Sequence, residues 1–315
     1  MANGIAIEEE TALRNFLEMP IPLEQLRTSL LDLSCPIAKR THAAFILRTM
    51  GSIDAVSILS EALRNKNDSS LMRHELAYIL GQIQNPVVVP QLIDILSDES
   101  DDILVRHESA EALGAIGAEI ALDSLAKFST HDSAEIAETC LIAIDLINWR
   151  KNGESISRSE YLSVDPAPPV ASSCTIEDLQ KSLMDSALSL FQRYRAMFSL
   201  RNMNSDESAL ALLIGFEDSS ALFRHEIAYV LGQMQRKAVT DGLVSVLQNK
   251  SEHRMVRHEA AEALGAIGGE EIEEILKQYS FNDEQVVVES CHVALDTMDY
   301  WNSNNFLNDE SILKV

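Results

Sequence analysis

The sequence predicts an all-α fold, an α-solenoid of eight helical hairpins arranged in two pseudosymmetric halves. Three observations support this prediction. Apolar residues recur at i, i+3, i+4 and i+7 in short blocks along the chain. Two such blocks occupy each repeat of 33 residues, and the whole pattern occurs twice at an offset of 151 residues. A single helix pair cannot bury its apolar face alone, so this pattern indicates stacked hairpins.

The composition favours helices over sheets. Aromatic residues make up only 5% of the chain, and Ala, Leu, Ile and Glu are abundant. With 315 residues and 46% hydrophobic content, the chain can form substantial cores. The sequence therefore predicts a globular helical protein.

The periodic blocks are separated by short segments rich in Gly, Asn, Asp, Ser or Pro, which mark turns. In the first half the blocks predict helices at residues 22–33, 36–50, 53–65, 70–84, 87–98, 102–116, 119–128 and 132–148. In the second half they predict helices at residues 175–187, 189–203, 206–217, 221–235, 237–249, 253–267, 270–279 and 283–299.

Residues 151–174 separate the two sets of helices. This segment is rich in serine and proline and has little periodicity, so it is predicted to be a linker. We therefore expect a four-hairpin half at residues 1–150 and another at residues 175–315. Because the linker is long when extended, the two halves can face each other.

The charge balance is strongly acidic, with 25 basic and 49 acidic residues and a formal net charge of −24. Such a chain disfavours nucleic acid or an anionic membrane as a partner and favours cationic ligands. The alternative is that acidic helix faces only keep the protein in solution.

The four cysteines, Cys35, Cys140, Cys174 and Cys291, show no CxxC spacing and are interpreted as small apolar residues in a reducing compartment. No apolar run approaches the roughly 18 residues of a membrane span, and the N-terminal residues are acidic where a signal peptide would be basic. We therefore expect a cytoplasmic protein.

The dipeptide His-Glu occurs four times, at residues 74–75, 107–108, 225–226 and 258–259, each time directly after an arginine. The pairs are 33 residues apart within each half and 151 residues apart between the halves. The segments RHELAYILGQIQ and RHEIAYVLGQMQ agree at nine of twelve positions. The histidines outside these pairs have no counterpart in the other half. The chain is therefore a tandem duplication that keeps four His-Glu pairs in register.

Each pair falls in the first turns of the second helix of a predicted hairpin. Neighbouring second helices stack about 8–10 Å apart, so His74 and His107 should be neighbours, as should His225 and His258. Two imidazoles and a carboxylate can share one cation and leave positions open for water, dioxygen or substrate. If the halves face each other, two such cations approach to about 3.5–4 Å, a distance at which one ligand bridges both. The sequence therefore predicts a dinuclear centre.

Several interpretations of these residues stay open. The spacing does not tell which glutamate of each half binds metal, and a lone glutamate near a helix start more often interacts with the helix dipole. The arginines before the pairs are interpreted as packing contacts between repeats. The Leu-Gly segments after the pairs are interpreted as close-packing and helix-ending positions.

The two classes of His-Glu pair differ four residues further along the helix. The outer pairs carry Tyr78 and Tyr229 there, whereas the inner pairs carry Glu111 and Glu262. Glu111 and Glu262 are predicted to accept hydrogen bonds from the ring N–H groups of ligand histidines. The alternative is that they are solvated on an exposed helix face.

Four His-Glu pairs at this spacing, in two halves of four hairpins, make the chain resemble deoxyhypusine hydroxylase, a family with a HEAT-like α-solenoid. The resemblance covers nearly the whole chain. It implies a monooxygenase that uses two iron ions (Fe2+/Fe3+) and dioxygen to hydroxylate the deoxyhypusine side chain of a translation factor precursor to hypusine.

The resemblance also implies roles for individual residues. One iron would be bound by His74, His107 and Glu108, and the other by His225, His258 and Glu259. Glu75 and Glu226 would then meet the amines of the substrate, which is a long cation and needs carboxylates near its nitrogens.

Two other functions are compatible with the residues alone. The first is a metal-free HEAT-like scaffold whose acidic concave face binds a basic partner. The second is a dinuclear hydrolase with zinc or manganese, because these ions accept the same ligands.

Overall fold

A computed structural model describes residues 22–153, 161–170, 174–281 and 283–302. Within these ranges the chain forms sixteen α-helices and no strands. In the first half they are α2 (Leu23–Leu31), α3 (Ile37–Met50), α4 (Ile53–Arg64), α5 (Ser70–Ile83), α6 (Val89–Ser97), α7 (Ile103–Ile116), α8 (Leu122–Phe128) and α9 (Ala134–Lys151). In the second half they are α10 (Ile176–Met184), α11 (Leu190–Met203), α12 (Asp206–Leu212), α13 (Ala221–Met234), α14 (Thr240–Gln248), α15 (Arg254–Ile267), α16 (Glu270–Tyr279) and α17 (Gln285–Asn302).

These helices confirm the predicted all-α hairpin fold, with small differences at helix ends. Four short 3-10 segments adjoin helices, at Pro86–Val88, Glu119–Ala121, Leu213–Glu217 and Lys237–Val239. The largest difference is the predicted helix at 206–217, which is regular only as far as Leu212. A Cβ atom at Gly215 would lie 2.5 Å from Cδ1 of Ile227, so the chain tightens there to bring its backbone against α13.

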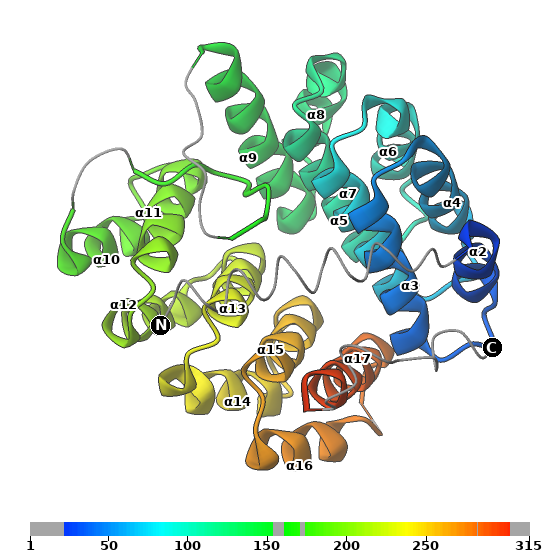
Figure 1. The fold of residues 1–315 in the computed structure, drawn as a ribbon. Coiled ribbons are helices and arrows are strands. Elements are labelled where there is room, and N and C mark those ends of the chain that lie inside the picture. Colours follow the sequence, from blue (N-terminus) through cyan, green and yellow to red (C-terminus); the bar gives the residue numbers. More distant parts are fainter. Residues whose placement is uncertain (1–21, 154–160, 171–173, 282, 303–315) are drawn as a thin grey trace.

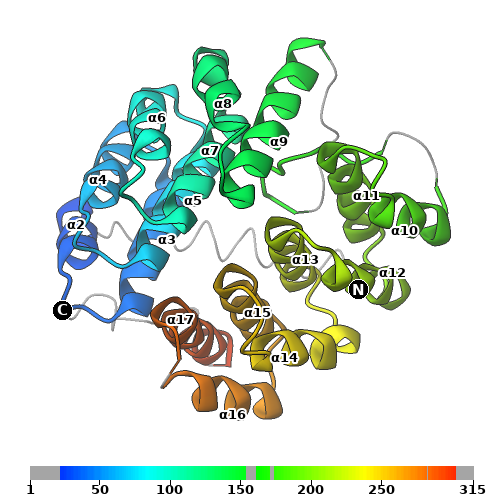
Figure 2. The same cartoon turned by 180° about the vertical axis from the view of Figure 1, so that it is seen from behind.

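The hairpins are arranged in a closed ring (Figures 1 and 2). The odd-numbered helices line the inside of the ring and the even-numbered helices lie outside. Helix α17 packs against α3 and α5, and α9 packs against α11 and α13. The four-hairpin arms at 22–151 and 176–302 therefore face each other, and their inner helices share one interior.

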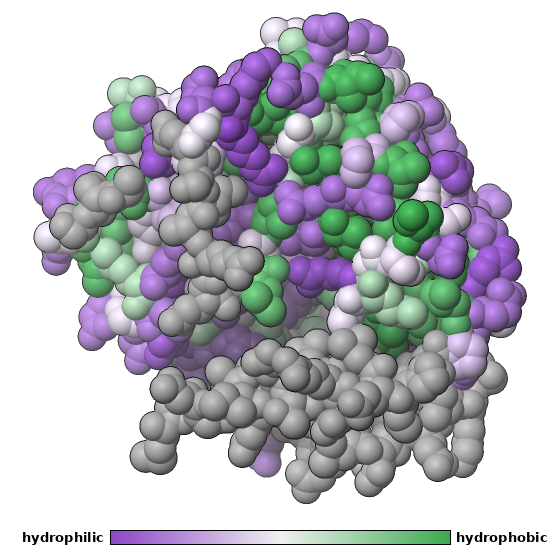
Figure 3. Space-filling model, turned by 45° about the horizontal axis from the view of Figure 1, so that its top comes forward, coloured by the Kyte–Doolittle hydropathy of each residue, from purple (hydrophilic) through white to green (hydrophobic). Residues whose placement is uncertain are grey.

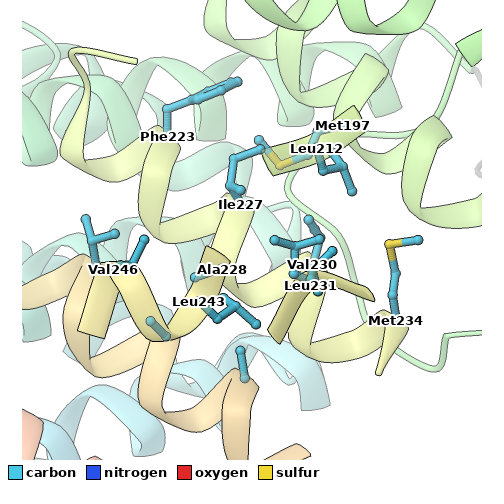
Figure 4. Packing of buried hydrophobic residues seen from close by; sticks show 14 of the residues in the cluster. Met197, Leu212, Phe223, Ile227, Ala228, Val230, Leu231, Met234, Leu243 and Val246 are labelled. Carbon is cyan, nitrogen blue, oxygen red and sulfur yellow. The ribbon is translucent and has the colours of Figure 1, made fainter. Parts of the chain in front are cut away.

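Two hydrophobic clusters hold the arms together internally, one centred on α2 to α9 and one on α10 to α17. Figure 4 shows the second cluster, in which Phe223, Ile227 and Leu231 of α13 pack with side chains of α11, α12 and α14. Leu71 of α5 and Leu104 of α7 belong to this cluster as well. The apolar core of the second arm is thus continuous with the inner helices of the first.

Neighbouring inner helices approach closely at the glycines that follow the His-Glu pairs. A Cβ atom at Gly81 would lie 2.8 Å from the Cα of Ala112, and one at Gly232 would lie 2.9 Å from the Cα of Ala263. Only glycine permits this distance without displacing a backbone. The close-packing interpretation is confirmed, and it explains how histidines two turns earlier on adjacent helices come together.

The arginines before the His-Glu pairs join successive hairpins. Arg73 donates from Nε to the carbonyl of Leu63 at the end of α4, and its guanidinium binds Asp101 of the next hairpin at 2.7 Å. Arg257 makes the same two contacts with Leu247 and Asp283. The packing interpretation is thereby confirmed for these two arginines.

The other two arginines vary the pattern. Arg224 binds Glu252 at 2.6 Å and the carbonyl of Asp218, because the irregular end of α12 shifts the available carbonyl. Arg106 donates to the carbonyl of Leu96 at 3.0 Å. Both remain contacts between neighbouring helices.

Replacing Arg73 with alanine is expected to lower the free energy of unfolding by about 3–5 kcal/mol, because the Asp101 carboxylate then stays buried without its partner. Both side chains of this pair are only 4% exposed. Urea denaturation followed by circular dichroism measures the change. Arg27→Ala, which removes an exposed ion pair with Glu61, serves as the control and should have a far smaller effect. Equal effects would contradict this account.

Residues 161–170 of the predicted linker contain no helix or strand and lie against the first arm. The backbone N–H of Val164 donates to Oε1 of Gln82 at 2.7 Å, and Nε2 of Gln82 donates to the Val164 carbonyl at 3.2 Å. Linker residues 154–160 and 171–173 lie outside the described part of the chain.

The same linker segment is tied to the second arm. Asp165 accepts two hydrogen bonds from the guanidinium of Arg201, at 2.6 and 2.8 Å, and Nε2 of Gln233 donates to Oγ of Ser163 at 3.1 Å. Gln233 is the counterpart of Gln82 at the 151-residue offset. The described linker residues therefore bridge equivalent positions of the two arms.

Candidate metal centre

Each of the four repeated histidines is the fifth residue of an inner helix: His74 in α5, His107 in α7, His225 in α13 and His258 in α15. A side chain caps the start of each helix by accepting a backbone N–H; the caps are Ser69, Asp102, Ser220 and His253. Because the caps fix where the helices begin, all four histidines project from the same level of the ring.

The four imidazoles meet in the interior. Within each arm the ring centroids are 5.3 Å apart for His74 and His107 and 5.4 Å apart for His225 and His258. Across the arms the centroids of His74 and His258 are 5.3 Å apart, and those of His107 and His225 are 5.6 Å apart. The structure thus brings the predicted histidines of both halves into one cluster, in which none is more than 5% exposed.

Many nitrogens of this cluster have no hydrogen-bond partner within the described residues. Both ring nitrogens of His107 and of His225 are buried and unpaired, as is Nε2 of His258. A buried polar atom without a partner costs about 1–3 kcal/mol, so these three side chains would destabilise the site if no cation were bound. Cation binding would satisfy these atoms.

A carboxylate from the neighbouring inner helix completes each histidine pair. Oε2 of Glu108 lies 3.2 Å from Nε2 of His74, although not at a hydrogen-bonding angle, and Oε2 of Glu259 lies 3.2 Å from Nε2 of His225. His74, His107 and Glu108 offer donor atoms that all lie within 4.8 Å of one another. This donor set fits a divalent transition metal.

In the second arm the compact donor group consists of His225, His258 and His74 rather than Glu259. His74 reaches across the interface because the two arms are in contact at the histidine level. Glu259 contacts His225 and is the pseudosymmetric counterpart of Glu108, and its role as a ligand stays a prediction.

Burial and neighbouring charges set the protonation of these groups. Burial lowers the pKa of His107, His225 and His258 well below the usual range, which favours the neutral imidazole that binds metals. Burial alone would lower the pKa of His74 too, but the carboxylates of Glu108 and Glu75 outweigh it and raise that pKa.

The carboxylates are crowded as well as buried. Burial, followed by the charge of Glu111, raises the pKa of Glu226 well above its usual range, and burial followed by the charge of Glu262 raises the pKa of Glu75. Among the described residues, the cavity beside the histidines is lined by no lysine or arginine. These raised pKa values favour the neutral acids, and cations bound at the site would take the place of their protons.

The cavity has a volume of about 150 Å³. Its lining comprises Phe45, His74, Glu75, Tyr78, Glu108, Glu111, His225, Glu226, Tyr229, Glu259 and Glu262. All the glutamates predicted as ligands, substrate contacts or ring acceptors are present, whereas His107 and His258 are not among the lining residues. Figure 3 shows a hollow near the middle of one face, above the grey atoms. Hydrophilic residues lie along part of its edge.

The predicted roles of Glu111 and Glu262 have unequal support. Oε1 of Glu262 lies 3.6 Å from Nδ1 of His258, and Oγ of Ser290 donates to Glu262 at 2.7 Å. Glu111 lines the cavity but is not placed at His107 in this way. The ring-acceptor role stays a prediction for both.

Sequence reasoning missed two contributors. Ser290 could have been found, because Thr139 stands at its counterpart position in the other half and both are small hydroxyl residues. Phe45 could not, because Ala196 stands at its counterpart and the residue lies outside every motif. The hydrogen bond between the Tyr78 and Tyr229 hydroxyls, at 2.9 Å, also depends on closure of the ring.

The fold and the site together define a HEAT-repeat protein with a buried cluster of histidines and carboxylates that could hold metal ions. A family model for HEAT repeats matches residues 23–104, 68–144 and 207–295. None of the helices in the described ranges combines the length and apolar character needed to cross a bilayer.

Known proteins with matching sequences identify the family. The chain is 44% identical to deoxyhypusine hydroxylase of Danio rerio, over 89% of this chain and 92% of that protein. It is 46% identical to the Mus musculus enzyme, over 90% and 94%. The structure of human deoxyhypusine hydroxylase in complex with glycerol matches with a TM-score of 0.85 and 40% identity, over 94% of this chain and 99% of that one. The chain belongs to the deoxyhypusine hydroxylase family and is an enzyme that acts by hydroxylation in hypusine formation.

Proposed function

We propose that the chain is a non-haem di-iron monooxygenase that hydroxylates the deoxyhypusine side chain of a translation factor precursor, using dioxygen. The single observation that carries this proposal is the meeting of two pseudosymmetric sets of two histidines and one carboxylate in one buried cluster. Two metals held by these residues could act together on one small molecule.

In this proposal residues 1–150 supply His74, His107 and Glu108 for one iron, and residues 175–315 supply His225, His258 and Glu259 for the other. Residues 151–174 link the two halves. When bound, the iron ions supply the binding and activation of dioxygen by cycling between Fe2+ and Fe3+. Two histidines and one carboxylate are fewer ligands than such an ion accepts, which would leave positions for dioxygen.

The remaining carboxylates bind and orient the substrate. Glu75 and Glu226 line the cavity beside the ligand set without belonging to it, so they can pair with the ammonium groups of deoxyhypusine. Because both carboxylates are nearly fully buried, such ion pairs would be shielded from water and would fix the position of the methylene groups between the nitrogens. The same burial excludes bulk water from the reacting carbon.

The net charge of −24 supports a basic protein partner and gives no support for nucleic acid or a membrane. A cytoplasmic location accords with the cysteines, because Cys140 and Cys291 are buried free thiols. Burial raises the pKa of each to about 12, so both are unreactive.

The test is a reaction of the iron-loaded chain with a deoxyhypusine-containing substrate protein, a reductant and isotopically labelled dioxygen. Monooxygenation places one labelled oxygen atom in the new C–OH group and sends the other into water, with both electrons coming from the reductant. Intact-mass spectrometry of the substrate should show the labelled atom. Oxygen incorporated from labelled water instead, or no incorporation in the presence of bound iron, would contradict the proposal.

A further inference from the structure

The mouth of the cavity is formed one helical turn beyond the His-Glu pairs. The eight residues of the pairs are at most 9% exposed, whereas the residues four positions after each histidine are partly exposed and line the cavity. These residues are Tyr78, Glu111, Tyr229 and Glu262. A ligand that enters the cavity must pass between them.

A tyrosine bridge divides this mouth. The hydroxyls of Tyr78 in α5 and Tyr229 in α13 are hydrogen-bonded at 2.9 Å, and Nε2 of Gln233 donates to Tyr229 at 2.9 Å. Helices α5 and α13 belong to opposite arms and lie diagonally across the ring, with α7 and α9 to one side and α15, α17 and α3 to the other (Figure 1). The mouth is thereby split into an α7 side, which contains Glu111, and an α15 side, which contains Glu262.

The α7 side is closed by the linker. Glu111, Thr139, Leu222 and the linker residue Pro166 enclose a small cavity of about 10 Å³. Linker residue Asp165 is anchored close by through Arg201. Little space remains there for an entering side chain.

The α15 side has a different character. Phe45 of α3 gives it an apolar wall, and no described linker residue lines the main cavity. The Glu262 side chain is 23% exposed, so a charged group can meet it from solvent. An apolar wall beside an exposed carboxylate suits a chain of methylene groups that carries ammonium groups.

The two predicted substrate-binding glutamates, Glu75 and Glu226, also differ from each other in their contacts. Oε1 of Glu75 already contacts Nδ1 of His74 at 3.1 Å. Oε1 of Glu226 is buried and has no partner within the described residues, and Glu226 is only 2% exposed. A carboxylate of this kind needs a cation to offset its burial, and it lines the same cavity as Tyr78, Tyr229 and Glu262.

We propose that the substrate side chain enters on the α15 side, between Phe45 and Glu262, and passes beneath the tyrosine bridge so that its terminal ammonium binds Glu226. This inference rests on the proposed function and gives the side chain one direction in a pseudosymmetric site. The secondary amine, nearer the substrate backbone, then lies at Glu75 and Glu262. Three N–H donors of a primary ammonium satisfy the unpaired carboxylate better than a secondary amine would.

The experiment compares kcat/KM for the natural substrate and for a substrate in which a methyl group replaces the terminal ammonium. In the unmodified enzyme the replacement should lower kcat/KM by roughly 10- to 100-fold, the value of a charged hydrogen-bonded contact. In Glu226→Gln the difference between the two substrates should nearly disappear, whereas in Glu75→Gln it should persist. Both changes keep the side-chain size, and elemental analysis of each variant confirms that metal is retained.

A difference that persists in Glu226→Gln, or that disappears in Glu75→Gln, would overturn the proposed direction. If the unmodified enzyme failed to hydroxylate the natural substrate at all, the proposed function itself would fall, so the two failures are distinguishable.

A second pair of matched variants tests the side on which the substrate enters. Glu262→Gln should raise KM by several-fold more than Glu111→Gln, its pseudosymmetric counterpart, and the reverse order would place entry on the α7 side.

Discussion

Replacing His258 with alanine is expected to reduce the bound iron from about two ions per chain to about one and to abolish hydroxylation. His258 is fully buried, and its Nε2 atom has no partner among the described residues. Without it, the site in the second arm keeps one histidine and one carboxylate, which is too few protein ligands for tight binding. Elemental analysis of the purified variant measures the loss.

The pseudosymmetry of the ring supplies a second variant and a control. His107→Ala removes the counterpart imidazole and should empty the other site to the same extent. His292→Ala removes an exposed histidine of α17 that has no counterpart in the other half, and it should keep both ions. Circular dichroism should show that all three variants retain their helices. If metal content were unchanged in both buried variants, the assignment of the centre would be wrong.

The histidine cluster could be predicted from the sequence because it depends on local rules. A helix cap five residues before each histidine and a glycine two turns after it fix the height and the spacing of the imidazoles. Both features recur at 33 and 151 residues. Any fold that stacks these hairpins places His74 beside His107.

The mouth of the cavity could not be predicted from the sequence because it depends on how the ring closes. The Tyr78–Tyr229 hydrogen bond joins opposite arms, and Phe45 lies on α3, which packs against α17 where the ring closes. Neither contact has a periodic signature. The linker illustrates the same limit, because its composition predicts a connector but not the pairing of Asp165 with Arg201.

The asymmetry of the site was hidden for a related reason. Duplication preserves the four His-Glu pairs, so the two halves look equivalent in the repeated segments. The two halves differ in the hydrogen bonds that residues outside the repeated segments make. Ser290 donates to Glu262 in one half, whereas Thr139 donates to a backbone carbonyl in the other. Such differences give a pseudosymmetric cavity a direction, which a substrate with two unlike ends requires.

Mutation is expected to distinguish glutamates that bind substrate from glutamates that bind metal. Glu226→Ala should keep both irons and weaken substrate binding, because this carboxylate lines the cavity but is paired with no histidine. Glu259→Ala should instead lose the iron of the second arm, because Glu259 lies 3.2 Å from Nε2 of His225. We expect the KM of Glu226→Ala to rise by roughly 10- to 100-fold, the value of a charged hydrogen bond.

The counterpart variant Glu75→Ala makes this prediction sharper. Glu75 contacts Nδ1 of His74, and a carboxylate that orients a ligand histidine contributes roughly 10- to 100-fold to metal affinity. Glu75→Ala should therefore bind substrate weakly and also lose iron when iron is limiting, whereas Glu226→Ala should not lose iron. Iron titrations at fixed protein concentration, together with KM measurements at saturating iron, separate the two effects. Loss of iron from Glu226→Ala at saturating iron would make Glu226 a metal ligand. The roles proposed for Glu226 and Glu259 in the second arm would then have to be exchanged.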